Sequence, residues 1–341
     1  MSEREERQPV AAAPSAGDLS AELTLRPGSL DEYVGQSEAK RALTTLLRAA
    51  RQRGEAADHL LFHGPPGLGK TTLASIVARE LDVPIRFTSG TAIDHGGDLA
   101  AILTNLQPRQ VLFIDEIHRL SRAVEEVLYP AMEDGHIDIV YGKGPSATLL
   151  RLEVQPFTLI GATTRIGMIS APLRDRFGAV QRLDYYGEPE LAAIITRSAG
   201  ILRIPLADAA AALIAARSRG TPRVANRLLR RVRDEVQVAG APEITADAAR
   251  AALEGMLVDD AGLDATDRKL LEVMVEKFGG GPVGVAAMAA LLGESPDTLE
   301  DVFEPYLMRI GFLDRTPQGR VVTERGRAHI GRPSDSLWGR R

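Results

Sequence analysis

The stretch GPPGLGKT at residues 64–71 constrains the fold of this chain more than any other feature of its sequence. It matches the pattern G-x-x-x-x-G-K-S/T in full, follows the apolar run HLLF and precedes the helical pattern TTLASIVAREL. Such a loop needs a strand before it and a helix after it, because backbone N–H groups at the helix start must converge on one anion. The sequence therefore predicts a strand, a phosphate-binding loop and a helix, in that order.

This loop also supplies candidate ligands for a nucleotide and its metal ion. Lys70 is expected to neutralise the β- and γ-phosphate oxygens, and the Thr71 hydroxyl is a candidate ligand for Mg²⁺. A plain Gly-Pro turn is the alternative, and the order of the flanking segments argues against it. The loop residues that we assign to nucleotide binding are Gly67, Leu68, Gly69, Lys70, Thr71 and Thr72.

From about Leu60 to Tyr185, apolar runs of strand length alternate with amphipathic helical stretches. This alternation is typical of a mostly parallel sheet covered by helices, so the expected fold class is α/β. The five candidate strands are HLLFHG, PIRFTSG, VLFIDE, FTLIGATT and AVQRLDYY. Between the third and fourth runs, residues 137–152 alternate in polarity around two glycines and a proline, which predicts an inserted hairpin.

Two further segments follow this α/β segment. Residues 188–258 show Ala, Leu and Arg at helical spacing and no convincing strand. The last segment mixes helical patterns with GFLDRTPQGRVVTERG, whose Pro and Gly favour a hairpin turn. The predicted organisation is a disordered tail at 1–20, a large domain at 21–186, a small helical domain at 187–258, a third domain at 259–335 and a tail at 336–341.

Composition and charge exclude several classes of protein. The 341 residues carry a net charge of -5 and no cysteine, so disulfides and thiolate metal sites are excluded. The N-terminal sequence lacks a basic stretch followed by an apolar one, which together with the absence of cysteine predicts a cytoplasmic protein. Residues 305–341 differ from the average, with eight arginines against three carboxylates.

An acidic pair ends the third apolar run. In VLFIDEIH, Asp115 is a candidate Mg²⁺ ligand through water, and Glu116 is a candidate base for the water that attacks a phosphate. The alternative is a strand that ends in two solvated carboxylates. In GATTR, Thr164 is our candidate for positioning that water, with Thr163 the second choice, while helix caps or turn residues are the alternative for both.

Five stretches together resemble the AAA+ ATPases: GPPGLGKTTLA, LFIDEIHRL, LIGATTR, SAPLRDRFG and GTPRVANRLLRRVRD. With LRPGSLDEYVGQ before them and EPYLMRIGFLDRTPQGR after them, the chain resembles more narrowly the RuvB family of bacterial Holliday-junction branch-migration motors. The resemblance extends from about Leu25 to Gly326. It implies an AAA+ P-loop domain, a helical lid domain and a C-terminal winged-helix domain, and a homo-hexameric ring that hydrolyses ATP with Mg²⁺.

The resemblance also implies roles for individual residues. An arginine of one subunit reaches the nucleotide of its neighbour, and we assign this role to Arg176, with Arg174 assisting or pairing with Asp175; a surface Arg-Asp-Arg cluster is the alternative. Arg223 resembles the arginine that carries lid movement to the γ-phosphate. The nucleotide-binding set is completed by Leu25, Arg26 and Tyr186 around the adenine, although Tyr186 could equally be a core residue, and by Glu133, Asp134 and Gly135.

The expected partners follow from the same resemblance. Arg315 and Arg320 flank the hairpin turn of the winged helix and are expected to contact DNA phosphates, although a solvated basic wing is the alternative. Where Pro296 stands, relatives often carry an arginine, so a DNA contact is missing or moved. The 137–152 hairpin corresponds to the segment that contacts RuvA, and RuvC is the expected resolvase partner. A clamp-loader-like or remodelling AAA+ ATPase is the alternative function, and a nucleotide-dependent switch is another.

Overall fold

The computed structural model describes residues 23–141 and 148–331. Both predicted tails and the turn of the 137–152 hairpin lie outside these residues. The described residues form two compact units: one lies within residues 26–185, and the other contains residues 23–25 together with residues 186–331.

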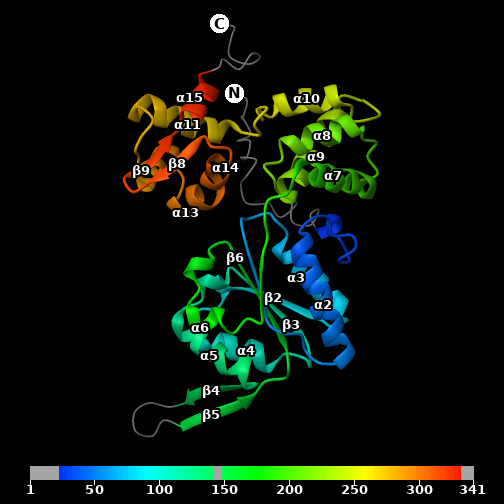
Figure 1. Ribbon diagram of the computed structural model, residues 1–341, viewed down its shortest axis with the longest axis vertical. Coiled ribbons are helices and arrows are strands. Elements are labelled where there is room, and N and C mark those ends of the chain that lie inside the picture. Colours follow the sequence, from blue (N-terminus) through cyan, green and yellow to red (C-terminus); the bar gives the residue numbers. More distant parts are fainter. Residues whose placement is uncertain (1–22, 142–147, 332–341) are drawn as a thin grey trace, which may run out of the picture. The chain divides into compact units, whose positions relative to one another are not determined.

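A parallel sheet in the order β2-β3-β6-β1-β7 forms the centre of the 26–185 unit (Figure 1). The register pairs Leu60 of β1 with Ile160 of β6, and His63 with Thr163, so these two strands end level with each other. All five predicted strands are confirmed, and the fold class is α/β. Their bounds are β1 (Leu60–His63), β2 (Ile85–Ser89), β3 (Val111–Asp115), β6 (Thr158–Thr163) and β7 (Ala179–Arg182).

Helices cover both faces of this sheet (Figure 1). On one face, alternate residues of β3 such as Leu112 and Ile114 join a buried cluster with Leu99 and Leu128 from two covering helices. The helices are α2 (Ser37–Arg53), α3 (Lys70–Leu81), α4 (Gly96–Thr104), α5 (Arg122–Glu133) and α6 (Ala171–Arg174). Short 3-10 turns are η1 (Gly90–Ala92), η2 (Ile117–Arg119) and η4 (Ile166–Met168).

The predicted inserted hairpin is confirmed as an antiparallel pair that projects from this unit (Figure 1). Its strands are β4 (His136–Tyr141) and β5 (Thr148–Glu153). At its base, Ile137 pairs with Leu152, and Arg151 donates two hydrogen bonds to Asp138, at 2.9 and 3.1 Å. This two-point ion pair fixes the register of the two strands near the sheet.

The second unit begins with a helical segment, as the spacing of its apolar residues predicted. Its helices are α7 (Glu188–Leu202), α8 (Asp208–Ala216), α9 (Pro222–Val238) and α10 (Ala246–Gly255). Thr221 caps α9 by accepting a hydrogen bond from the N–H of Val224, and Pro222 occupies the first helical position. A single bridge between Leu206 and Ile244 ties the loops of this segment together.

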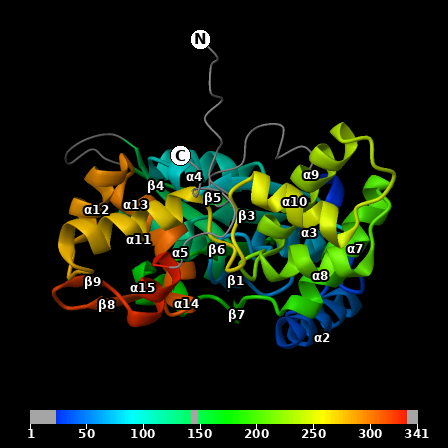
Figure 2. The same cartoon turned by 90° about the horizontal axis from the view of Figure 1, so that it is seen from above.

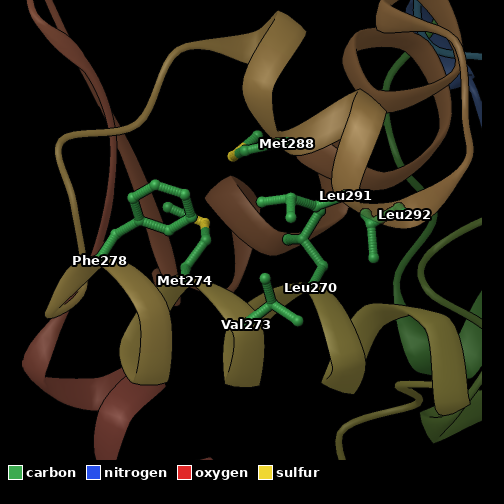
Figure 3. Close-up of a pocket in the computed structure, with 7 residues that line it drawn as sticks. All are labelled: Leu270, Val273, Met274, Phe278, Met288, Leu291 and Leu292. Atoms are coloured by element: carbon green, nitrogen blue, oxygen red, sulfur yellow. The ribbon is translucent and has the colours of Figure 1, made fainter.

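The last segment has the helices and hairpin of a winged helix. Its elements are α11 (Ala265–Phe278), α12 (Val285–Leu292), α13 (Pro296–Thr298), the π-helical turn η5 (Leu299–Phe303), α14 (Glu304–Arg309), β8 (Leu313–Thr316), β9 (Gly319–Val322) and α15 (Glu324–Ile330). The predicted hairpin is confirmed, and in both views it lies beside α14 and α15 (Figures 1 and 2). A small apolar pocket opens between α11 and α12, where Met274 and Phe278 lie across from Met288 (Figure 3).

A buried charged cluster joins the helical segment to the winged helix. Arg219, in the loop before α9, is 4% exposed and contacts two carboxylates of the winged helix, Asp267 at 2.5 Å and Asp264 at 3.2 Å. In return, Arg309 of α14 donates a hydrogen bond to the Arg219 carbonyl at 3.2 Å. Burial raises the pKa of Asp267 to about 7, against the lowering effect of the guanidinium. The two segments are thus held together by charged side chains.

His59 links the sheet to α5 in the other unit. Its Nδ1 accepts a hydrogen bond from the Leu159 N–H at 2.9 Å, so the remaining ring nitrogen, Nε2, carries the proton and donates to the Met132 carbonyl at 3.2 Å. The ring also packs on Phe157. Burial lowers the pKa of His59, because the charged form would lose its hydration and its acceptor nitrogen.

This pKa direction predicts that the 26–185 unit loses stability in acid. The unfolded chain binds the His59 proton near its ordinary pKa of 6.5 and the folded chain only at lower pH, so stability falls as pH drops through this range. His59→Asn should cost about 1–3 kcal/mol at pH 7.5, because the Met132 carbonyl loses its donor. Thermal unfolding of both proteins at pH 7.5 and 5.5 checks this. An equal loss on acidification in both would contradict it.

Candidate nucleotide-binding and catalytic site

The loop at residues 64–69 approaches its neighbours so closely that glycine is required. Gly64 has a φ of 144°, and a Cβ there would collide with the Leu183 carbonyl oxygen. Gly69 has a φ of 96°, and a Cβ would lie 2.8 Å from the Tyr33 hydroxyl. Gly67 also has a positive φ, of 80°. The loop is therefore held as a tight cradle whose N–H groups precede the N-terminus of α3.

Lys70 lies inside this cradle. It is the first residue of α3 and is 7% exposed, and its Nζ donates hydrogen bonds to the carbonyls of Gly64 at 2.8 Å and Pro65 at 3.0 Å. An ammonium group enclosed by a loop at a helix N-terminus suits a polyphosphate. Thr71 and Thr72 follow on the first turn of α3. The consecutive residues assigned to nucleotide binding, 67–72, thus form the end of the loop and the first turn of α3.

Asp115 and Glu116 lie at the carboxyl end of β3. The Asp115 Oδ1 accepts the Glu116 N–H at 3.0 Å. Glu116 has a left-handed backbone, with a φ of 45°, which is uncommon for a residue other than glycine. Gly90 permits this conformation, since a Cβ there would lie 2.5 Å from the Glu116 carbonyl oxygen.

The Glu116 carboxylate faces the end of β6. Its Oε2 accepts hydrogen bonds from the Thr164 N–H at 3.3 Å and hydroxyl at 3.2 Å. The alternative, Thr163, instead contacts the His118 ring at 2.9 Å and accepts the Arg165 N–H. The structure therefore brings Thr164, rather than Thr163, to the candidate base.

His118 is a member of this cluster that sequence reasoning missed. Its Nδ1 lies 3.2 Å from Glu116 Oε2, and its side chain is almost fully buried. In the sequence, only its place two residues after Glu116 in IDEIHR points to His118. This spacing does not predict the contact, because it arises from the 3-10 turn η2, which the apolar spacing does not indicate.

The structure places Arg176 against α5. Its NH2 contacts Glu133 at 3.1 Å, its NH1 donates to the Pro172 carbonyl at 2.8 Å, and its guanidinium lies 4.4 Å from the centre of the Tyr129 ring. Arg174 is more exposed and lies 4.0 Å from Asp175. Glu133 ends α5, with Asp134 and Gly135 directly after it. Arg176 and Glu133, both assigned to the nucleotide site, are thus neighbours.

The remaining nucleotide candidates are divided between the two units. Leu25 and Tyr186 are both buried in one unit; the Leu25 carbonyl accepts a hydrogen bond from Arg197 and the Tyr186 N–H donates to the Gly220 carbonyl. Arg223 is exposed in the first turn of α9 in the same unit, and Arg26 belongs to the other.

The winged-helix arginines differ from expectation in one respect. Arg315 is exposed, 3.5 Å from Glu300. Arg320, its cross-strand partner, is 6% exposed and donates to Glu304 at 2.7 and 3.1 Å and to Glu300 at 2.7 Å. Its guanidinium is therefore not displayed at the hairpin tip, because α14 and the π-helical turn supply two carboxylates that draw it inward.

Two of the residues described in 23–141 and 148–331 have side chains suited to Mg²⁺. A hydroxyl at Thr71 and a carboxylate at Asp115 are hard oxygen ligands, which fit Mg²⁺ because this ion takes few protein ligands beside phosphates. No group of three His, Cys, Asp or Glu side chains suited to a metal ion occurs in this range. None of its helices has the length and apolar character of a membrane span.

Three family models match the chain in succession. They are the RuvB Holliday junction DNA helicase P-loop domain at residues 25–183, the RuvB AAA lid domain at 186–259 and the RuvB C-terminal winged-helix domain at 260–331. Solved structures of the Thermotoga maritima RuvB Holliday junction branch migration motor are also similar. One has 51% identity and a TM-score of 0.82, covering 90% of this chain and 98% of that one.

Solved structures of two mutants of the same Thermotoga protein are similar to this chain as well. Both have 52% identity and a TM-score of 0.84, and they cover 90% and 91% of this chain and 98% and 99% of their own. The similarity therefore extends over nearly the whole of each protein.

The geometry predicts that Glu116→Gln separates binding from hydrolysis. The amide keeps the shape of the side chain but cannot take a proton, so hydrolysis should fall by about 10²- to 10⁴-fold while nucleotide affinity changes little. Single-turnover hydrolysis and titration with a fluorescent ATP analogue measure the two quantities. Hydrolysis at the wild-type rate would show that Glu116 is not the base.

Proposed function

The chain belongs to the RuvB family of Holliday junction DNA helicases, and from this premise we propose how its residues drive branch migration. It is a P-loop ATPase of the AAA+ class that binds nucleotide and acts on Holliday-junction DNA in recombination and repair. A clamp-loader-like or remodelling function is not favoured, because the winged-helix model matches along with the other two. The observation that carries our account is the contact of Glu116 with Thr164 at the sheet edge from which the phosphate loop leaves.

In this account, the residues of the loop bind and orient ATP. Lys70 exchanges its two loop carbonyls for phosphate oxygens, and the N-terminus of α3 stabilises their charge. Thr71 and Asp115 would hold Mg²⁺, which supplies charge neutralisation between the phosphates when bound. Glu116 accepts the proton of the attacking water, and the Thr164 hydroxyl holds the carboxylate in place for that transfer.

We assign the arginine finger to Arg176 and the lid sensor to Arg223. In a ring, Arg176 of one subunit would reach the γ-phosphate of the next and stabilise the charge that spreads over its oxygens. Support comes from the segment itself: Ser170 caps α6, so the arginine follows a short, fixed turn rather than a long loop. Leu25, Arg26 and Tyr186 complete the adenine site in this account, with Glu133, Asp134 and Gly135 near the finger.

Mixed oligomers test the finger. Arg176→Ala and Lys70→Ala should each lose about 10³-fold or more in ATP hydrolysis. In an equimolar mixture, about a quarter of the interfaces join an intact site to an intact finger, so activity should recover to that order. Steady-state hydrolysis with and without duplex DNA measures this. A mixture as inactive as its components would rule out an Arg176 finger acting between subunits.

We propose that Arg315 contacts DNA phosphates and that Arg320 supports the wing from inside. Arg315 is 58% exposed, whereas Arg320 neutralises the buried Glu304. The hairpin at 137–152 is proposed to bind RuvA, with RuvC as the resolvase partner and a hexameric ring as the assembly. This proposal for the hairpin is supported by its projection from the 26–185 unit (Figure 1) and by the ion pair between Arg151 and Asp138 at its base.

Two substitutions in the wing should act differently. Arg315→Glu should weaken duplex binding and lower the dependence of binding on salt, while stability is unchanged. Arg250→Glu, at a surface arginine of comparable exposure on α10, is the matched control. Arg320→Gln should instead cost about 3–5 kcal/mol of stability, because Glu304 stays buried without its partner. DNA titrations at several salt concentrations and thermal unfolding separate these effects, and equal DNA affinity for wild type and Arg315→Glu would contradict the first.

A further inference from the structure

A hydrogen-bonded cluster lies directly beneath Arg176. Glu125 of α5 is 6% exposed, and its Oε2 accepts hydrogen bonds from the Tyr129 hydroxyl at 2.8 Å and the Ser170 hydroxyl at 2.6 Å. The two hydroxyls lie 3.2 Å from each other. A buried carboxylate is stable only with such partners, so this cluster fixes the orientation of each member.

The cluster joins α5 to the segment that carries the finger. Ser170 caps α6 by accepting a hydrogen bond from the Leu173 N–H at 3.3 Å, and α6 ends two residues before Arg176. Glu125 therefore bonds to the residue that begins α6, Ser170. It also bonds to Tyr129, whose ring contacts Arg176 at the other end of this segment.

The Tyr129 ring lies against the Arg176 guanidinium. The guanidinium carbon lies 4.4 Å from the ring centre, within the range of a cation–π interaction. The Arg176 side chain is 24% exposed, and its Nε is buried without a hydrogen bond to the described residues. Glu133, by contrast, is 54% exposed, so its bond to Arg176 is screened by water. Burial raises the pKa of Tyr129, so its hydroxyl stays protonated and keeps donating to Glu125.

We propose that Tyr129 is a positioning residue for the arginine finger, with its ring fixing the plane of the Arg176 guanidinium while Glu125 and Ser170 fix the ring. The inference rests on the proposed action of Arg176 between subunits. Transfer of a phosphoryl group demands a donor held to a narrow range of positions, and a flat aromatic face leaves the guanidinium edge free to donate. Tyr129 itself touches no reacting atom.

A positioning role for Tyr129 differs from a merely structural role in the subunit where a substitution acts. Tyr129 matters in the subunit that provides the finger and not in the subunit that provides the nucleotide site. The two roles can be separated by combining Tyr129→Leu with each of the two inactive parent subunits in turn. In one mixture Tyr129→Leu accompanies Lys70→Ala, which donates the finger; in the other it accompanies Arg176→Ala, which has no finger to position.

We expect the first mixture to recover at least tenfold less ATP hydrolysis than the parent mixture, and the second to match the parent within about twofold. Tyr129→Phe, which keeps the ring but loses the bond to Glu125, should fall between when placed with Lys70→Ala. Phe87→Leu, at an exposed aromatic of the same unit, is the control in both positions. Thermal unfolding and ring size by light scattering accompany each variant.

Equal losses in both mixtures would show that Tyr129 only maintains the fold, and no loss in either would show that Arg176 needs no support from the ring. Both results overturn the inference while leaving the trans finger intact. If the parent mixture itself fails to recover activity, the finger assignment is wrong, and the inference about Tyr129 falls with it. Should Tyr129→Leu fail to fold, the same comparison with Tyr129→Phe decides.

Discussion

The exit of β1 into the phosphate loop is the constraint on which the rest of the catalytic unit depends. β1 lies between β6 and β7, and its last residue pairs with Thr163 and Arg182. The chain must then turn away at Gly64, where the Leu183 carbonyl leaves no room for a side chain. Because the strands are parallel, this turn, the Asp115–Glu116 pair and the threonines at the end of β6 all lie at one edge of the sheet. The order and direction of the strands alone therefore bring these segments together, whatever side chains they carry.

Much of this arrangement could be predicted from the sequence because its signals are local. A glycine-rich loop between an apolar run and a helical pattern defines its own geometry, and five apolar runs define five strands. Asp115 and Glu116 follow directly from their place at a strand end. Thr164 was preferred to Thr163 from the sequence, but the contact that distinguishes the two, the hydrogen bond of Thr164 to Glu116, depends on how β6 lies beside β3.

Other features depend on residues far apart in the chain. The arginines of the C-terminal segment predicted a basic surface, but Arg320 is neutralised by Glu300 of η5 and Glu304 of α14, which precede the hairpin in the chain. Similarly, Tyr129 and Glu125 look like ordinary members of an amphipathic helix, and only their contact with Ser170, more than forty residues later, distinguishes them. Charge counts and apolar spacing describe one element at a time, so they do not reveal such pairs.

The charged cluster at Arg219 links the winged helix to the start of α9. The Arg219 side chain contacts Asp264 and Asp267 of the winged helix, and the Arg219 carbonyl accepts a hydrogen bond from Arg309. Two residues later, Thr221 caps α9. Gly220 between them has no side chain, and a Cβ there would collide with Arg309. The winged helix is therefore bonded to the loop before α9 at both the side chain and the carbonyl of Arg219. A displacement of the winged helix would act through these bonds on the first turn of α9, where Arg223 lies.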